Sequence, residues 1–231
     1  MGSAAHIPGV RAVVLFGSAA RRDSDAYSDR DVCAIVDNLR DREIVPLRRR
    51  VATAYDTDEE SVSVYRAATI AQMARSGSLF LWHLKREGSV LYERRGAVRR
   101  LLRALRAYES YSDDLLRFQE AFDDTASAIE DTKRVDLFDL HVLFVVVRNV
   151  SMLLTVKAGS PSFGRATAFR DATRRYGRLP ITASDYDYLT RGHLVYSRGS
   201  DILVPRLSKV RAAAIIKRVS HFLRFAWRRI G

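Results

Sequence analysis

Four residues near the start of the chain, Gly17, Ser18, Asp29 and Asp31, have types and a spacing that suit metal-assisted phosphate chemistry. An apolar run ends in the Gly17-Ser18 turn, and after a ten-residue spacer Asp29 opens an Asp-x-Asp pair that leads into a second apolar run. Alternate side chains of a strand share one face, so we expect Asp29 and Asp31 to point the same way. Two such carboxylates repel each other unless a cation lies between them, and a Mg²⁺ ion that also binds substrate phosphates is the usual cation.

The Gly17-Ser18 turn is suited to hold those phosphates. Gly17 has no side chain to obstruct a phosphate, and a following helix would direct backbone N–H groups toward it. The Ser18 hydroxyl can donate a hydrogen bond, and Arg21 can neutralise phosphate charge. We therefore expect Gly17, Ser18 and Arg21 to bind a nucleotide and Asp29 and Asp31 to bind metal and act in catalysis. An ordinary strand–helix turn and a solvated strand start would each explain half of this pattern, but not the joint spacing.

This arrangement resembles the nucleotidyltransferase superfamily that includes DNA polymerase β and the antibiotic and minimal nucleotidyltransferases. The segment 16–18, the spacer and the Asp-x-Asp pair follow the signature of that superfamily, and Arg21 matches an arginine of its glycine-serine segment. The chain departs from the pattern at Ala19, Arg22 and Arg30. The resemblance implies a Mg²⁺-dependent enzyme, with Mn²⁺ as a substitute, that transfers an NMP group from an NTP. ATP, as the donor of AMP, is the NTP that we expect.

The resemblance also implies a third carboxylate on a neighbouring strand, and there the chain holds Ser63. Serine cannot serve as an ionised ligand or as an efficient base. Three explanations stay open. The preceding acidic turn could supply the acid, from Asp56, Asp58, Glu59 or Glu60. The acceptor could bring a carboxylate or phosphate of its own. Otherwise the chain binds a nucleotide without turning it over.

The chain divides into a mixed half and a helical half. Strand patterns cover residues 10–16, 31–36, 61–65 and 88–92, and helical patterns cover 18–22, 40–55 and 69–87. After residue 97 the strand patterns stop, and helices are predicted over 101–108, 113–130, 137–156, 162–176, 184–196 and 205–230. This order predicts an α+β chain, with a polymerase β-like catalytic domain at 1–98 and a helical bundle at 99–231. The segment 137–154 is apolar nearly all round, which predicts the buried central helix of that bundle.

The composition of the chain indicates which partners it can bind and in which cellular compartment it is expected. The 231 residues carry a formal net charge of +12 and are 47% hydrophobic, which allows a real core and attracts polyanions such as RNA. Solvated arginines would explain the same charge. The sole cysteine, Cys33, excludes a disulfide framework and is expected to be a buried core residue. With no signal-peptide pattern and no apolar run near ~20 residues, we expect a cytoplasmic protein with no membrane partner.

Two further residues have both a structural and a functional interpretation. His83 on the helix 69–87 could act as a base, but a structural role is favoured. Arg148, followed by Asn149, interrupts the apolar helix 137–156. It could reach toward a nucleotide or an acceptor, although a satisfied polar pair within the bundle is favoured.

The last helix has a basic face that is either solvated or part of a nucleic-acid groove, where Trp227 could stack on a base.

The function that the sequence predicts is NMP transfer, with RNA (a tRNA end, for example) or a protein hydroxyl favoured as the acceptor. An aminoglycoside is a polycation and fits a basic chain poorly. A catalytically impaired protein that binds nucleotide or nucleic acid is the alternative, and a helical nucleic-acid-binding protein is a third and weaker candidate. The sequence leaves the oligomeric state open, a homo-oligomer included.

Overall fold

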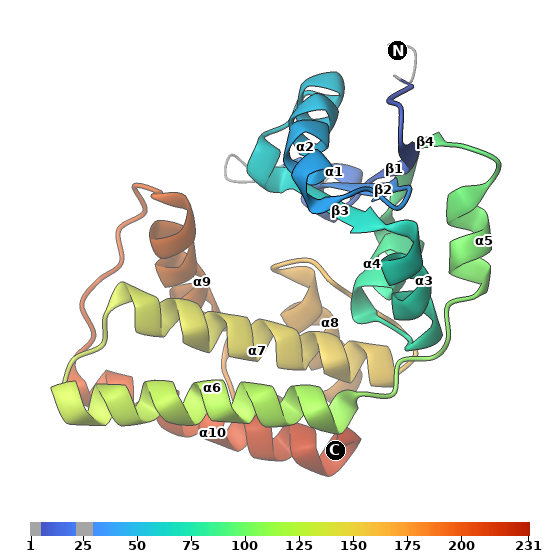
Figure 1. Cartoon of the computed structure of the whole chain (residues 1–231). Coiled ribbons are helices and arrows are strands. Elements are labelled where there is room, and N and C mark those ends of the chain that lie inside the picture. Colours follow the sequence, from blue (N-terminus) through green and yellow to red (C-terminus); the bar gives the residue numbers. More distant parts are fainter. Residues whose placement is uncertain (1–5, 22–29) are drawn as a thin grey trace. The chain divides into compact units, whose positions relative to one another are not determined.

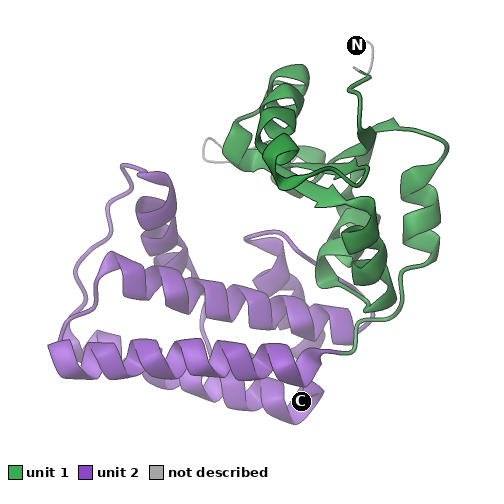
Figure 2. Ribbon diagram, viewed as in Figure 1, with its two compact units in different colours: residues 1–109 green, residues 110–231 purple. Residues whose placement is uncertain are grey.

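The computed structural model describes residues 6–21 and 30–231, and the side chain of Arg21 lies outside that description. Contacts divide the chain into two compact units, residues 1–109 and 110–231 (Figure 2). The first unit is mixed α+β and the second is all helical, as the sequence predicts. The predicted functional domains, 1–98 and 99–231, differ from these units mainly by α5 (Ala97–Arg103), which packs against β1 and β4 of the first unit. The functional boundary stays a prediction.

The first unit is built on a four-stranded sheet in the order β3-β2-β1-β4 (Figure 1). Its strands are β1 (Val10–Leu15), β2 (Val32–Val36), β3 (Val62–Arg66) and β4 (Ser89–Glu93). The strand β1 is antiparallel to both β2 and β4, whereas β2 and β3 are parallel. Every residue of β2 is buried and apolar, because helices cover both faces of the sheet at this strand.

The two faces of the sheet have separate cores. The helix α2 (Asp41–Tyr55) covers one face, where Leu47 and Val51 pack with Val32 and Ala34 of β2. The helices α3 (Ala67–Arg75), α4 (Leu79–Glu87) and α5 cover the other face, where Leu81 packs in the same core as Cys33. Alternation along β2 therefore assigns odd-numbered residues to the α3–α4 face.

The structure corrects the predicted helix over residues 69–87, which is two helices separated at Gly77. This glycine has a φ of +74°, and a Cβ there would lie 2.0 Å from the carbonyl oxygen of Ala107. An L side chain would strain the backbone and collide with the 104–109 segment. The break depends on a contact thirty residues away, so local helical spacing does not reveal it.

Three other helices also begin at residues that differ from the prediction. The helix α5 spans Ala97–Arg103 rather than 101–108, because the Glu93 carboxylate accepts a hydrogen bond from the Val98 N–H at its start. The helix α10 (Lys209–Ile230) begins later than residue 205, since the Ser208 hydroxyl accepts from the Arg211 N–H and caps it. The helix α8 (Thr167–Tyr176) likewise begins later than residue 162.

The second unit is arranged around α7 (Leu137–Lys157), which packs against α6 (Tyr111–Thr132), α8, α9 (Ala183–Arg198) and α10 (Figure 1). This confirms the predicted central helix. By length and composition α7 could also cross a membrane, but half of its most apolar window is buried inside the unit. Burial against four neighbouring helices accounts for that apolarity.

Candidate active site

The candidate site lies where β1 ends and β2 begins. The backbone N–H of Phe16 donates to the Asp31 carbonyl at 3.0 Å, directly beyond the Leu15–Val32 pair of the antiparallel ladder. Gly17 and Ser18 follow at the start of α1 (Gly17–Arg21). The ladder thus brings the glycine-serine turn beside Asp31, although twelve residues lie between Ser18 and Asp31 in the sequence.

Gly17 and the Asp31 carboxylate are in close contact. Gly17 has a φ of +72°, and a Cβ built on it would lie 2.6 Å from Asp31 Oδ2. Only a residue without a side chain allows the carboxylate this position against the turn. Gly17 is buried, while Ser18 and Asp31 are partly exposed, so both residues reach the surface beside the turn.

The remaining predicted site residues are only partly described. Arg21 is the last residue of α1, but its side chain lies outside the described part of the chain. Asp29 also lies outside the described residues. Within residues 6–21 and 30–231, no group of three or more histidine, cysteine or acidic side chains is arranged to hold a metal ion. Asp31 is therefore the one member of the predicted carboxylate pair whose surroundings are known.

Ser63 occupies the place on β3 where the third carboxylate is expected. It pairs with Cys33 in the parallel ladder between β2 and β3. Asp31 and Cys33 alternate onto the α3–α4 face, and Ser63 lies on that same face of the adjacent strand. The neighbouring position is thus half-buried and close to the site, but it carries a hydroxyl instead of an acid.

The acidic turn 56–60 lies beside the start of β2. The Thr57 hydroxyl donates to the Arg30 carbonyl at 2.6 Å, which fixes this turn one residue from Asp31 along the chain. Glu59 is engaged elsewhere, because Arg49 Nε of α2 contacts its carboxylate at 2.7 Å. Asp56, Asp58 and Glu60 are exposed. The Glu59 side chain is also 42% exposed, but its ion pair with Arg49 makes the other three acids the better candidates for a replacement.

An aromatic cluster with a histidine–glutamate pair packs behind the turn. The ring of Phe16 packs edge-on against Phe80 and His83, with centroids 5.4 and 5.5 Å apart, and the ring centroid of Tyr65 lies 5.2 Å from that of Phe80. His83 Nε2 is 3.0 Å from Glu87 Oε2, and both side chains are at most 15% exposed. These rings anchor the residue that precedes Gly17. The i, i+4 spacing of His83 and Glu87 was the available sequence signal for this pair.

The Cys33 thiol is buried and unreactive. Burial raises the pKa of its thiol to about 12, so it stays protonated at neutral pH. It is a core residue on the α3–α4 face, in agreement with the expectation from the sequence.

Arg148 is held within the second unit. Its Nη1 donates to the Asn149 side-chain oxygen at 3.0 Å, and its Nη2 donates to the Phe163 carbonyl at 2.7 Å. These two hydrogen bonds agree with the favoured interpretation from the sequence, in which Arg148 and Asn149 form a satisfied polar pair within the bundle. Its positive charge nevertheless acts on its surroundings, because Arg148 contributes to the lowered pKa of His193.

Comparison with solved structures places the fold. The spectinomycin adenyltransferase AAD(9) from Enterococcus faecialis, solved with ATP and spectinomycin, is similar over 93% of this chain and 92% of its own, with 11% identity and a TM-score of 0.52. A nucleotidyltransferase-like protein from Exiguobacterium sibiricum (94% and 70%, 12% identity, TM-score 0.41) and a toxin–antitoxin solved with AMP-PNP (55% and 89%, 19% identity, TM-score 0.30) are also similar. No protein-family model and no curated protein matches the chain. The chain has a nucleotidyltransferase fold.

Proposed function

We propose that this chain is a cytoplasmic, Mg²⁺-dependent nucleotidyltransferase that transfers AMP from ATP to a hydroxyl of RNA or of a protein. The observation that carries the proposal is the Asp31 carboxylate, which lies so close to Gly17 that a Cβ there would approach it to 2.6 Å. A metal-binding oxygen and a turn suited to phosphates thus adjoin each other, as nucleotidyl transfer requires. The nucleotidyltransferase fold supports this assignment.

The residues have distinct roles in the proposed reaction. The acceptor oxygen forms a bond to the α-phosphorus, the bond from that phosphorus to the β-phosphate oxygen breaks, and pyrophosphate leaves. Backbone N–H groups of the Gly17-Ser18 turn and the Ser18 hydroxyl bind the phosphate tail, and Arg21 neutralises its charge. Asp31, together with Asp29, would hold Mg²⁺, for which carboxylate oxygens are the usual protein ligands. When bound there, the ion would supply charge stabilisation and help to activate the attacking oxygen.

The proton of the acceptor needs a base, and the 56–60 turn is the place that we assign to it. Asp56, Asp58 and Glu60 are exposed carboxylates on a turn that is hydrogen-bonded to the start of β2. The acceptor that we favour is RNA, a tRNA end included, because a chain with a net charge of +12 attracts polyanions. A polycationic aminoglycoside would be repelled by the same surface.

Label transfer tests the proposal directly. The chain is incubated with each labelled NTP, Mg²⁺ and total RNA, with and without a protein extract, and the labelled acceptor is identified. We expect transfer from ATP that is lost in Asp31→Asn. Asp37→Asn is the matched control, because Asp37 follows the opposite end of the same strand and forms exposed ion pairs with Arg11 and Arg94. Loss in both variants, or transfer to no acceptor, would contradict the assignment.

The second candidate function is nucleotide binding without turnover, which Ser63 in the third-acid position favours. Ser63→Asp separates the two. A chain that lacks only the third carboxylate should gain transfer from this substitution, because the new acid lies on the face of Asp31. A chain that uses an acid of the 56–60 turn should gain nothing from it, and one of Asp56→Asn, Asp58→Asn and Glu60→Gln should abolish transfer.

A further inference from the structure

A continuous series of ring–ring contacts, some stacked and some tilted or edge-on, runs through the second unit. Its inner half is buried. Phe169 stacks on Tyr186 with centroids 4.4 Å apart, Tyr186 lies 5.6 Å from Phe144, and Phe144 stacks on His193 at 4.2 Å. Phe144, Phe169 and Tyr186 are core residues. The stacking of His193 on the buried Phe144 therefore holds the His193 ring in place.

The outer half of the series reaches the surface. His193 Nδ1 is 2.9 Å from His141 Nδ1, and the two ring centroids are 4.9 Å apart. His141 contacts Tyr196 at 4.9 Å, and Tyr196 contacts Phe138 at 5.6 Å. Tyr196 and Phe138 are 49% and 53% exposed. Among the described residues they are the only large aromatic side chains this exposed, and they touch each other.

The spacing along two helices explains why these rings share a face. Phe138, His141 and Phe144 are three residues apart on α7, and His193 and Tyr196 are three residues apart on α9. Side chains three or four residues apart on a helix are neighbours. The two rows face each other because α7 and α9 pack along their length.

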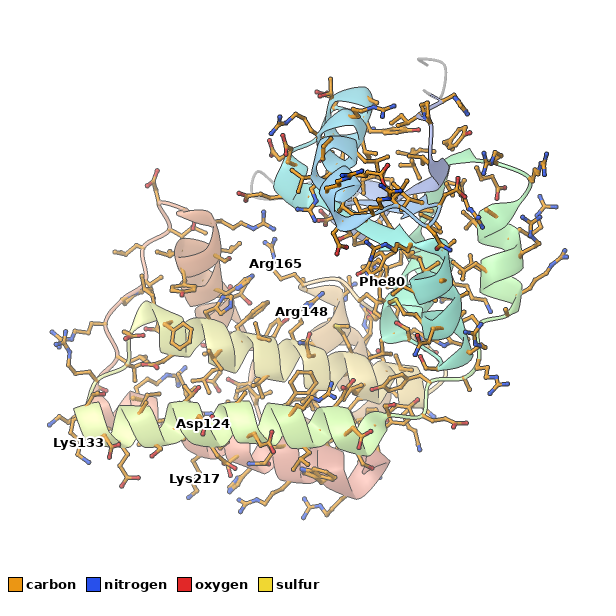
Figure 3. The ribbon with its side chains drawn as sticks, viewed as in Figure 1. Phe80, Asp124, Lys133, Arg148, Arg165 and Lys217 are labelled. Atoms are coloured by element: carbon orange, nitrogen blue, oxygen red, sulfur yellow. The ribbon has the colours of Figure 1, made fainter. Side chains whose placement is uncertain are left out.

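Positive charge surrounds the middle of the series. Burial first, and then the charges of His141, Arg165, Arg148 and Arg198, lower the pKa of His193 to about 4. The three arginines therefore lie within electrostatic range of its ring. Figure 3 shows Arg148 and Arg165 on the same side of α7. Arg198, the last residue of α9, is exposed two residues after Tyr196 in the sequence. The exposed aromatic pair thus ends a series of ring contacts in which His193 lies within range of three arginine charges.

We propose that Phe138 and Tyr196, together with the exposed Arg198 that ends the same helix α9, form a docking surface for single-stranded RNA. Unpaired bases stack on exposed aromatic rings, and arginines bind the neighbouring phosphates, so the two features together fit a single strand better than either fits alone. Charge complementarity argues against a second copy of this chain, since each copy would bring the same arginines to the contact. The choice of RNA rests on the proposed function, in which RNA is the acceptor of the nucleotidyl group.

Binding without NTP or metal tests the surface separately from the reaction. Fluorescence anisotropy of a labelled 12-nucleotide single-stranded RNA with the full chain gives the affinity. We expect Tyr196→Ala and Phe138→Ala each to weaken binding roughly tenfold, and Tyr196→Phe, which keeps the ring, to bind like the unchanged chain. Leu116→Ala is the matched control, because Leu116 is 51% exposed on α6 of the same unit. Circular dichroism confirms that each variant is folded.

The charge contribution has its own readout. Arg198→Gln should reduce the slope of log affinity against log salt by about 0.7, the value for one phosphate contact to a single strand. Arg224→Gln, another exposed arginine of the second unit, should alter it less if Arg198 touches the strand. Asp31→Asn should bind RNA normally, so failure of transfer and failure of docking remain distinguishable. Equal affinity of Tyr196→Ala and Leu116→Ala, or self-association that only Tyr196→Ala abolishes, would overturn the proposal.

Discussion

Replacing Gly17 with alanine would isolate the contact between the turn and Asp31. The φ of +72° would cost an L-residue about 1–2 kcal/mol of folding free energy. The new Cβ would also lie 2.6 Å from Asp31 Oδ2, whereas ordinary contacts begin near 3.4 Å, so the oxygen must move by about 0.8 Å. A carboxylate is the free end of a side chain and can make that movement. The folding cost should therefore stay near the backbone value.

The same displacement should be far more harmful to the reaction. Misplacing a catalytic group by about 1 Å can cost about a hundredfold in rate. We therefore expect Gly17→Ala to lower AMP transfer by up to about a hundredfold and to weaken binding of ATP with Mg²⁺ in isothermal titration. Its free energy of unfolding should fall by only about 1–2 kcal/mol.

Gly9→Ala is the matched control for this experiment. Gly9 is in the same unit with a φ of +85°, but its Cβ would meet side-chain carbons of Leu39 at 3.5 Å and Leu47 at 4.0 Å, which are ordinary contacts. Urea denaturation followed by Trp82 fluorescence, in a Trp227→Phe background, reports the stability of the first unit for both variants. Similar stability with transfer lost only in Gly17→Ala would support the geometry. Transfer in Gly17→Ala equal to that in Gly9→Ala would refute it.

Three further predictions concern titratable groups away from the turn. Because the pKa of His193 is lowered from 6.5 to about 4, the unfolded chain binds more protons between these pH values and stability falls as pH drops. After a discount for partial exposure, His193→Phe should remove about 2 kcal/mol of that acid sensitivity. The measurement is Trp227 fluorescence in a Trp82→Phe background, and an unchanged pH dependence of stability would contradict the prediction. Asp185 is fully buried against Arg211 and Arg218, so Asp185→Asn should lower the free energy of unfolding by roughly 2–3 kcal/mol in the same assay; an unchanged midpoint would contradict this. The Cys33 thiol should react with a thiol reagent only after denaturation. Rapid labelling of the native chain would show that the core on the α3–α4 face of the sheet is accessible to solvent.

The strands could be predicted from the sequence because their signals are local. Residues 32–36 form an all-apolar run between Asp31 and Asp37, and the predicted strand over 31–36 is β2 at Val32–Val36. The break between α3 and α4 at Gly77 could not be predicted from the sequence, because it depends on the approach of Ala107 from another segment. The same limit applies to the acids of the 56–60 turn. Only the packed structure shows that Glu59 pairs with Arg49 while Thr57 joins the turn to Arg30.

The site is predictable only in part for a similar reason. The resemblance implies that Gly17 and Asp31 belong to one nucleotide–metal site, whereas the antiparallel pairing that brings them together is known only from the structure. The aromatic series of the second unit gave no such signal, because Phe144 and His193 are about fifty residues apart and their rings look like ordinary core residues in sequence. Rings from α7 and α9 form one series only when the two helices pack.

The position of Asp31 follows from the register of β2, which alternation of polarity alone would not fix. Because β2 is buried on both faces, a shift by one residue would exchange one apolar set for another at small cost while it moved Asp31 to the α2 face. Two backbone hydrogen bonds prevent that shift. Phe16 N–H donates to Asp31 at one end of the strand, and Asp37 N–H donates to Gly9 at the other, at 3.0 and 2.8 Å. The contacts that close the ladder therefore also orient the carboxylate toward the glycine-serine turn, so stability of the first unit and competence of the site depend on the same pairing.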